Sequence, residues 1–177
     1  IPDKQTKKID MATSVNIKMY KVGELGDCFL LRFKHEDVSR HMLIDCGSFR
    51  NSDKSAARLQ EIARDIKKQV KDGKIDIVVG THQHNDHVSG FVHAEEIFRE
   101  TGVGQVWLSW LDNPRSKQAT RIGESHLELR KSLKSASDKL QALSQTKKGK
   151  KGATPSAKKM TATKFLIDDL LGFFGAA

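Results

Sequence analysis

The spacing of hydrophobic positions changes along the chain from every second residue to every third or fourth. Residues 15–19 alternate between apolar and polar side chains, which predicts a strand because successive side chains of a strand leave on opposite faces. The apolar runs 28–33 and 41–45 predict two further strands. Over residues 53–72 the apolar positions recur at helical spacing, so we expect an amphipathic helix there.

The pattern after this helix favours alternating strands and helices. Residues 75–79 are almost wholly apolar, as expected for a strand with both faces covered. A helix is expected over 88–100 and a strand over 105–110, with Trp107 and Trp110 in the core. Strands first, followed by a strand–helix–strand order, indicate an α/β fold.

The last third of the chain has a different composition. Residues 1–114 hold 17 Lys and Arg against 17 Asp and Glu, whereas residues 115–164 hold 14 basic and 3 acidic residues. The net charge of +9 therefore belongs to this later segment. Within it we expect a helix over 124–145 and a linker over 146–159, followed by an apolar stretch over 165–174 that needs a partner surface.

The densest cluster of chemically active side chains follows the predicted strand 75–79. The sequence THQHNDHVSG, residues 81–90, places His82, His84, Asp86 and His87 within six positions. Imidazole nitrogens and carboxylate oxygens are the ligands of Zn²⁺ and similar cations. A polar loop that is merely rich in histidine is the alternative, but the density of ligands at a strand end favours a metal site.

This His-x-His-x-Asp-His pattern resembles the metallo-β-lactamase superfamily. Two more blocks, VGELGDCFLL at 22–31 and MLIDCG at 42–47, are similar to the N-terminal strands of superfamily members related to the hydrolase domain of DNA-uptake channel proteins. The resemblance implies the N-terminal half of an αββα sandwich over residues 11–114, followed by a basic, mainly helical segment. It also implies one or two metal ions, usually Zn²⁺ with Mn²⁺ or iron as alternatives, and hydrolysis by a metal-bound hydroxide.

The resemblance also implies roles for the individual residues. His82 and His84 would hold a first ion, and Asp86 and His87 a second. Asp86 would in addition orient the attacking water, which makes it the expected catalytic residue. Asp45, at the end of its strand, would orient the ligand loop by analogy with the family; an ordinary strand-end carboxylate is the alternative.

Further ligands expected from the family pattern have no clear counterpart. His126 is a weak candidate, because its lysine- and leucine-rich surroundings are typical of a solvated helix histidine. We therefore expect an incomplete site, either because the chain is a fragment or because another polypeptide completes the fold. Residues 115–177 would then be a helical insertion or linker, and residues 1–10, which precede Met11, a vector remnant.

The expected activity is hydrolysis of a phosphodiester or related ester, with nucleic acid as a candidate partner because of the basic segment. Hydrolysis of a small ester or lactam, and a scaffold module that keeps the loop without a competent site, remain alternatives. We expect self-association through exposed apolar surface, no membrane partner and a cytoplasmic location. Cys28 and Cys46 lie on neighbouring strands, where buried free thiols are favoured over a disulfide.

Overall fold

The computed structural model describes residues 13–23, 25–49, 52–71, 73–146 and 155–173. Its centre is a five-stranded sheet with the order β1-β2-β3-β4-β5. The first three strands are antiparallel, whereas β4 and β5 run parallel to β3. The strands are β1 (Thr13–Met19), β2 (Cys28–His35), β3 (Val38–Cys46), β4 (Ile75–Gly80) and β5 (Val103–Leu108).

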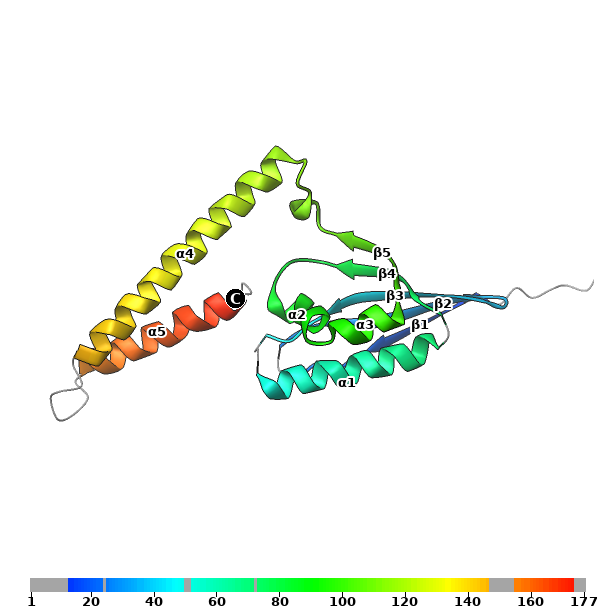
Figure 1. Ribbon diagram of the computed structural model, residues 1–177, viewed down its shortest axis with the longest axis horizontal. Helices are drawn as coiled ribbons and strands as arrows, with labels where there is room; N and C mark the ends of the chain where they lie inside the picture. The colour runs from blue at the N-terminus through cyan, green and yellow to red at the C-terminus, as the bar shows by residue number, and fades with distance from the viewer. Residues whose placement is uncertain (1–12, 24, 50–51, 72, 147–154, 174–177) are drawn as a thin grey trace, which may run out of the picture.

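Helices α1 (Asp53–Val70), α2 (Asn85–His93) and α3 (Glu95–Thr101) lie on one face of this sheet (Figure 1). Helix α1 begins with a capping box in which Ser52 and Ser55 bond each other's backbone amides, and its buried residues recur at helical spacing. They are Leu59, Ile62, Ala63, Ile66 and Val70. The amphipathic helix predicted from the sequence is therefore confirmed, and it covers a row of buried strand residues.

The opposite face of the sheet is open to solvent. Ile17 and Met19 expose 64% and 68% of their surface, and Ile77 and Val79 on β4 are only half-buried. The expectation that both faces of β4 are covered was therefore wrong. Trp107 on β5 is 50% exposed and Trp110 is 57% exposed, so the prediction that both tryptophans lie in the core was also wrong. Helices cover one face only, which leaves apolar side chains of the other face without a packing layer.

A pair of long helices follows the sheet. The short 3₁₀ helix η1 (Trp110–Asp112) leads into α4 (Lys117–Thr146), and α5 (Pro155–Phe173) packs along α4 (Figure 1). Helix α4 starts seven residues before the predicted start. The predicted linker is wrong over residues 155–159, which belong to α5, and its residues 147–154 lie outside the described residues. Phe165, Leu166 and Leu170 expose large apolar side chains, as expected for this stretch.

Several smaller expectations have clear outcomes. The helix predicted over 88–100 is divided at Ala94 into α2 and α3. Cys28 and Cys46 face each other across β2 and β3 as buried free thiols, and hydrogen bonding between them together with burial raises the pKa of Cys28. In the described residues, no helix has both the length and the apolar character needed to cross a membrane. The proposed remnant at residues 1–10 lies outside the described part.

Candidate metal centre

The predicted ligands gather where two neighbouring parallel strands end. Strands β3 and β4 are parallel, so the residues that follow each of them emerge at the same edge of the sheet. Asp45 is the penultimate residue of β3, and Thr81 is the first residue after β4. The ligand loop therefore begins directly beside the end of β3.

Asp45 connects this loop to the sheet. Its Oδ1 accepts a hydrogen bond from the Thr81 backbone N–H at 2.8 Å, and its Oδ2 accepts one from Thr81 Oγ1 at 2.7 Å. The same Oδ2 lies 2.8 Å from Nδ1 of His87. Asp45 is 3% exposed and has a positive φ of 53°, a conformation that the surrounding contacts must hold in place. Its contacts agree with a positioning role, which stays a prediction.

The start of α2 brings the remaining residues to the same point. His84 is the N-cap residue, and Asp86 and His87 lie in the first helical turn, where a carboxylate suits the positive end of the helix dipole. The turn before β2 supports them, because the Asp27 N–H donates to the Asp86 carbonyl at 3.0 Å. Gly47 permits this close approach, since a Cβ there would lie 2.4 Å from the Asn85 carbonyl oxygen.

All four predicted ligands come together in the structure. Ligand atoms of His82, His84 and Asp86 lie within 4.8 Å of one another. His87 is adjacent, with its ring centroid 3.8 Å from that of His82 and its Nε2 3.3 Å from Oδ2 of Asp86. The structure thus shows a three-residue group with a fourth side chain beside it, and it does not resolve the two separate pairs that the resemblance implies.

The side chains fit a bound cation. Asp86 is 5% exposed, and its buried Oδ1 has no hydrogen-bond partner among the described residues. His87 donates from Nδ1 to Asp45, so the lone pair of its Nε2 faces the Asp86 carboxylate. Two acceptor atoms at that distance need a proton or a metal ion between or beside them. Two or three imidazoles with one carboxylate are suitable donors for zinc and related cations.

The surroundings of His84 favour its neutral imidazole, the form that binds metal ions. Burial, and then the neighbouring His82, lower the pKa of His84 below its usual 6.5, while the Asp86 carboxylate acts in the opposite direction. His126 on α4 is close enough to lower the same pKa slightly. Its side chain is exposed and is not part of the three-residue group, which agrees with a solvated helix histidine.

Sequence reasoning assigned no role to several residues that hold the loop. Thr81 belongs to the quoted motif, and a hydroxyl between a strand and its ligands could have marked it as an anchor. Asp27, whose Oδ2 lies 3.8 Å from Nδ1 of His87, belongs to the block VGELGDCFLL at 22–31. Two long-range contacts had no such signal. The Gln83 amide donates to Asp112, and Asn85 Nδ2 donates to the Gly172 carbonyl at 2.7 Å.

Comparison with known proteins agrees with this geometry. A family model, that of the metallo-beta-lactamase superfamily, matches residues 23–137. The matched span contains Asp27, strand β3 with Asp45 and the ligand loop, and it runs past residue 114 into α4. The domain boundary placed at residue 114 stays a prediction. No curated protein and no solved structure matches the chain significantly.

Proposed function

The chain belongs to the metallo-beta-lactamase superfamily, and on this premise we propose that it carries the metal-binding part of a metal-dependent hydrolase. The convergence of His82, His84 and Asp86, with a buried carboxylate oxygen that has no hydrogen-bond partner among the described residues, is the observation on which this proposal rests. His82, His84 and Asp86 would hold a divalent cation, with Zn²⁺ as the first expectation and Mn²⁺ or iron as alternatives. His87 would be available to the same ion or to a second one.

A divalent cation held there supplies Lewis acidity, which makes water at the site more acidic and polarises the bond to be broken. The protein supplies position and proton acceptors. Asp45 fixes the tautomer of His87 by accepting from Nδ1, which turns Nε2 toward Asp86. Asp86 has two carboxylate oxygens, so one can contact a cation while the other accepts a proton from water. This arrangement supports Asp86 as the catalytic residue.

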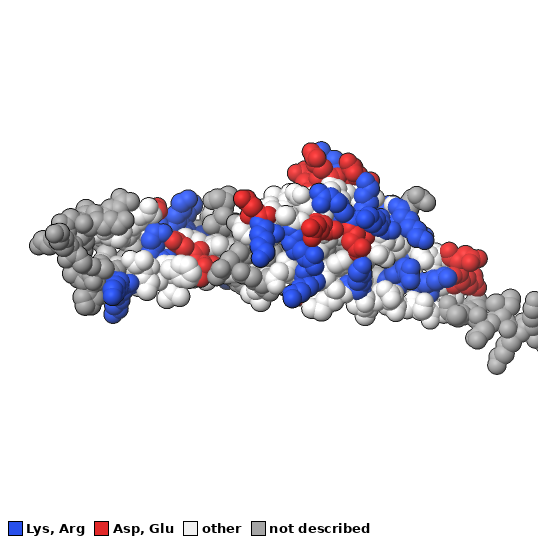
Figure 2. All heavy atoms as spheres, turned by 90° about the horizontal axis from the view of Figure 1, so that it is seen from below, with Lys and Arg blue, Asp and Glu red and all other residues white. Residues whose placement is uncertain are grey.

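For the substrate, we propose a phosphodiester, with nucleic acid as the candidate polymer. The sheet and its helices are electrically balanced, and Figure 2 shows Lys and Arg interspersed with Asp and Glu on the face over α1. The excess positive charge lies in residues 115–164, and α4 within this segment comes close enough to the site for His126 to act on the pKa of His84. A polyanion would therefore be attracted to the segment next to the site. The resemblance of the blocks at 22–31 and 42–47 to the DNA-uptake subgroup supports the same substrate class.

Turnover assays with a chromogenic phosphodiester, an ester and a lactam, each with added Zn²⁺ or Mn²⁺, test the proposal. We expect metal-dependent, slow cleavage of the phosphodiester, which His84→Ala and Asp86→Ala abolish. His35→Ala is the matched control, because His35 lies at the far end of β2 and contacts Thr13. Cleavage of the ester or lactam alone would replace the phosphodiester assignment. Metal binding without turnover of any substrate would favour the scaffold alternative, and activity retained in both ligand variants would refute the site.

A further inference from the structure

A row of polar side chains crosses the sheet on the face that α1 covers, away from the metal centre. Asn16, Arg32 and His41 stand directly opposite one another on β1, β2 and β3. The next row on the same face contains Leu30 and Leu43, both buried beneath α1. Asn16 and Arg32 are exposed and His41 is partly buried, so this polar row lies where the cover provided by α1 ends.

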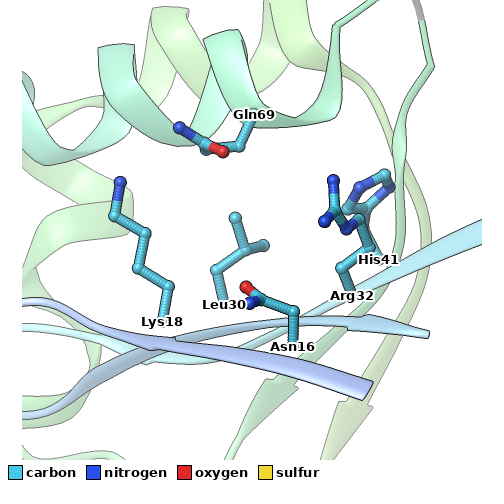
Figure 3. Close-up of a pocket in the computed structure, with 6 residues that line it drawn as sticks. All are labelled: Asn16, Lys18, Leu30, Arg32, His41 and Gln69. Carbon is cyan, nitrogen blue, oxygen red and sulfur yellow. The ribbon is translucent and has the colours of Figure 1, made fainter. Parts of the chain in front are cut away.

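These side chains surround a cavity of about 40 Å³ between the sheet and the last turns of α1. The cavity is lined by Asn16, Lys18, Leu30, Arg32, His41 and Gln69. Figure 3 shows Arg32 and His41 side by side at one end of the space, Lys18 at the other, and Gln69 of α1 above it. One water molecule needs roughly 10–15 Å³ of such space, so the cavity has room for about three waters or one phosphate-sized ion.

Two groups at the cavity lack partners within the described part of the chain. Nε2 of His41 is buried and makes no hydrogen bond there, which is costly for a polar atom. The Arg32 guanidinium has no carboxylate partner among the same residues. The other charges are balanced: Lys18 Nζ donates to Asp65 at 2.6 Å, and Arg40 pairs with Asp76 at 3.2 Å. The charge of the exposed Arg32 side chain and the buried imidazole nitrogen of His41 therefore face the cavity without a protein partner among the described residues.

We propose that this cavity, the His41 pocket, is a binding site for a phosphate-sized oxyanion. The Arg32 guanidinium supplies the charge and two N–H donors, and His41 Nε2–H supplies a third hydrogen bond. The Asn16 amide is within the same lining and adds a neutral donor. The ion is either free inorganic phosphate or the phosphate group of a nucleotide, since both present the same tetrahedral oxygens. This site is separate from the metal centre, which lies beyond the opposite end of β3.

The test is titration of the full chain with sodium phosphate, with sodium chloride at equal ionic strength as the reference. Calorimetry gives the affinity, and the ¹H–¹⁵N spectrum of the imidazole rings reports on His41 Nε2 directly. Arg32→Gln removes the unpaired charge from an exposed side chain, so the fold should persist, which circular dichroism checks. Lys34→Gln is the matched control, because it removes one charge from the same strand outside the pocket. We expect Kd to rise at least about tenfold for Arg32→Gln and less than about twofold for Lys34→Gln.

A second titration, with a nucleoside 5′-monophosphate, distinguishes the two sources of the ion. Tighter binding than inorganic phosphate would assign the pocket to a nucleotide phosphate, and equal or weaker binding to the free ion. Either result supports the oxyanion site if the His41 Nε2 signal moves. An unmoved Nε2 signal at millimolar phosphate would show that the cavity holds water only and would overturn the proposal. An equal loss of affinity in Arg32→Gln and Lys34→Gln would overturn it as well, because it would indicate general surface charge.

Discussion

The α/β layer, residues 13–108, and the helical hairpin formed by α4 and α5 are built on different principles. The layer buries Leu43, Leu59 and Ile66 completely between its sheet and helices. Among the described residues of the hairpin, only Ala119 and Ser137 are buried, and both side chains are small. Burial of large apolar side chains provides most folding free energy, so the stability of this chain resides in the layer.

The hairpin and the η1 helix that precedes it instead contribute contacts to the ligand loop. Asn85, at the start of α2, donates to the Gly172 carbonyl in α5, and Gln83 donates to Asp112 in η1. The layer therefore sets the positions of the ligands, while the hairpin restrains the loop that carries them.

The largest contrast should come from truncating one leucine in each region. Leu43→Ala leaves a cavity in a fully buried part of β3, and we expect it to lower the free energy of unfolding by about 2–5 kcal/mol. Leu127 on α4 is 48% exposed, so Leu127→Ala should change the free energy of unfolding by less than about 0.5 kcal/mol. Urea denaturation followed by circular dichroism measures both. Equal losses would show that the hairpin has a core of its own.

Replacing a glycine by alanine should have opposite signs in the two regions. In Gly47→Ala the new Cβ would lie 2.4 Å from the Asn85 carbonyl and 2.5 Å from the His87 N–H nitrogen, so the start of α2 must move. We expect the free energy of unfolding to fall by about 1–3 kcal/mol and metal binding to become weaker. Gly123 on α4 has no atom within 4 Å of such a Cβ, and Gly123→Ala should stabilise the helix by about 0.5–1 kcal/mol. A stable Gly47→Ala variant with unchanged metal affinity would contradict this description of the site.

The sequence allowed the ligand cluster to be predicted because its determinants are local. A short apolar strand, four ligand-type residues in six positions and a following helix bring these side chains to one strand end. The exposure of Trp107 was not predictable in this way, because it depends on whether another layer covers the far face of the sheet. The break between α2 and α3 at Ala94 was not predictable because no glycine or proline marks it in the sequence. The contact between Asn85 and Gly172 was not predictable because it joins residues far apart in the sequence.

Cutting the connection between the two regions should have a smaller and more local effect. Asn85→Ala removes the hydrogen bond to Gly172. We expect the free energy of unfolding to fall by no more than about 0.5–1.5 kcal/mol. Amide hydrogen exchange should become faster at the end of α5 and in the ligand loop, with the strands unaffected. Unchanged exchange in both segments would show that the hairpin does not restrain the loop.

The stabilities of the two regions should also respond differently to pH, and this effect should be smaller still. Burial, and then Arg32, lower the pKa of His41 below 6.5, while Asp76 opposes this. Neutral His41 therefore contributes to the stability of the layer above pH 6.5, and this contribution is lost as the pH falls through its lowered pKa. In the hairpin, Lys164 and then Ser137 lower the pKa of Asp168 below 3.8, so its contribution is lost only at much lower pH. Hydrogen exchange between pH 7 and pH 3 should show the layer responding first, and simultaneous loss in both regions would contradict this order.

Zn²⁺ binding measured by calorimetry is the most direct test of the claim that His82, His84 and Asp86 form a cation site. We expect the chain to bind about one equivalent of Zn²⁺, and His84→Ala and Asp86→Ala to weaken binding by about 100-fold or more, because each removes a ligand from the three-residue group. His126→Ala should retain the affinity, since His126 is exposed on α4 and lies outside that group. Equal affinity in the parent chain and in both ligand variants, or a complete loss in His126→Ala, would contradict the assignment.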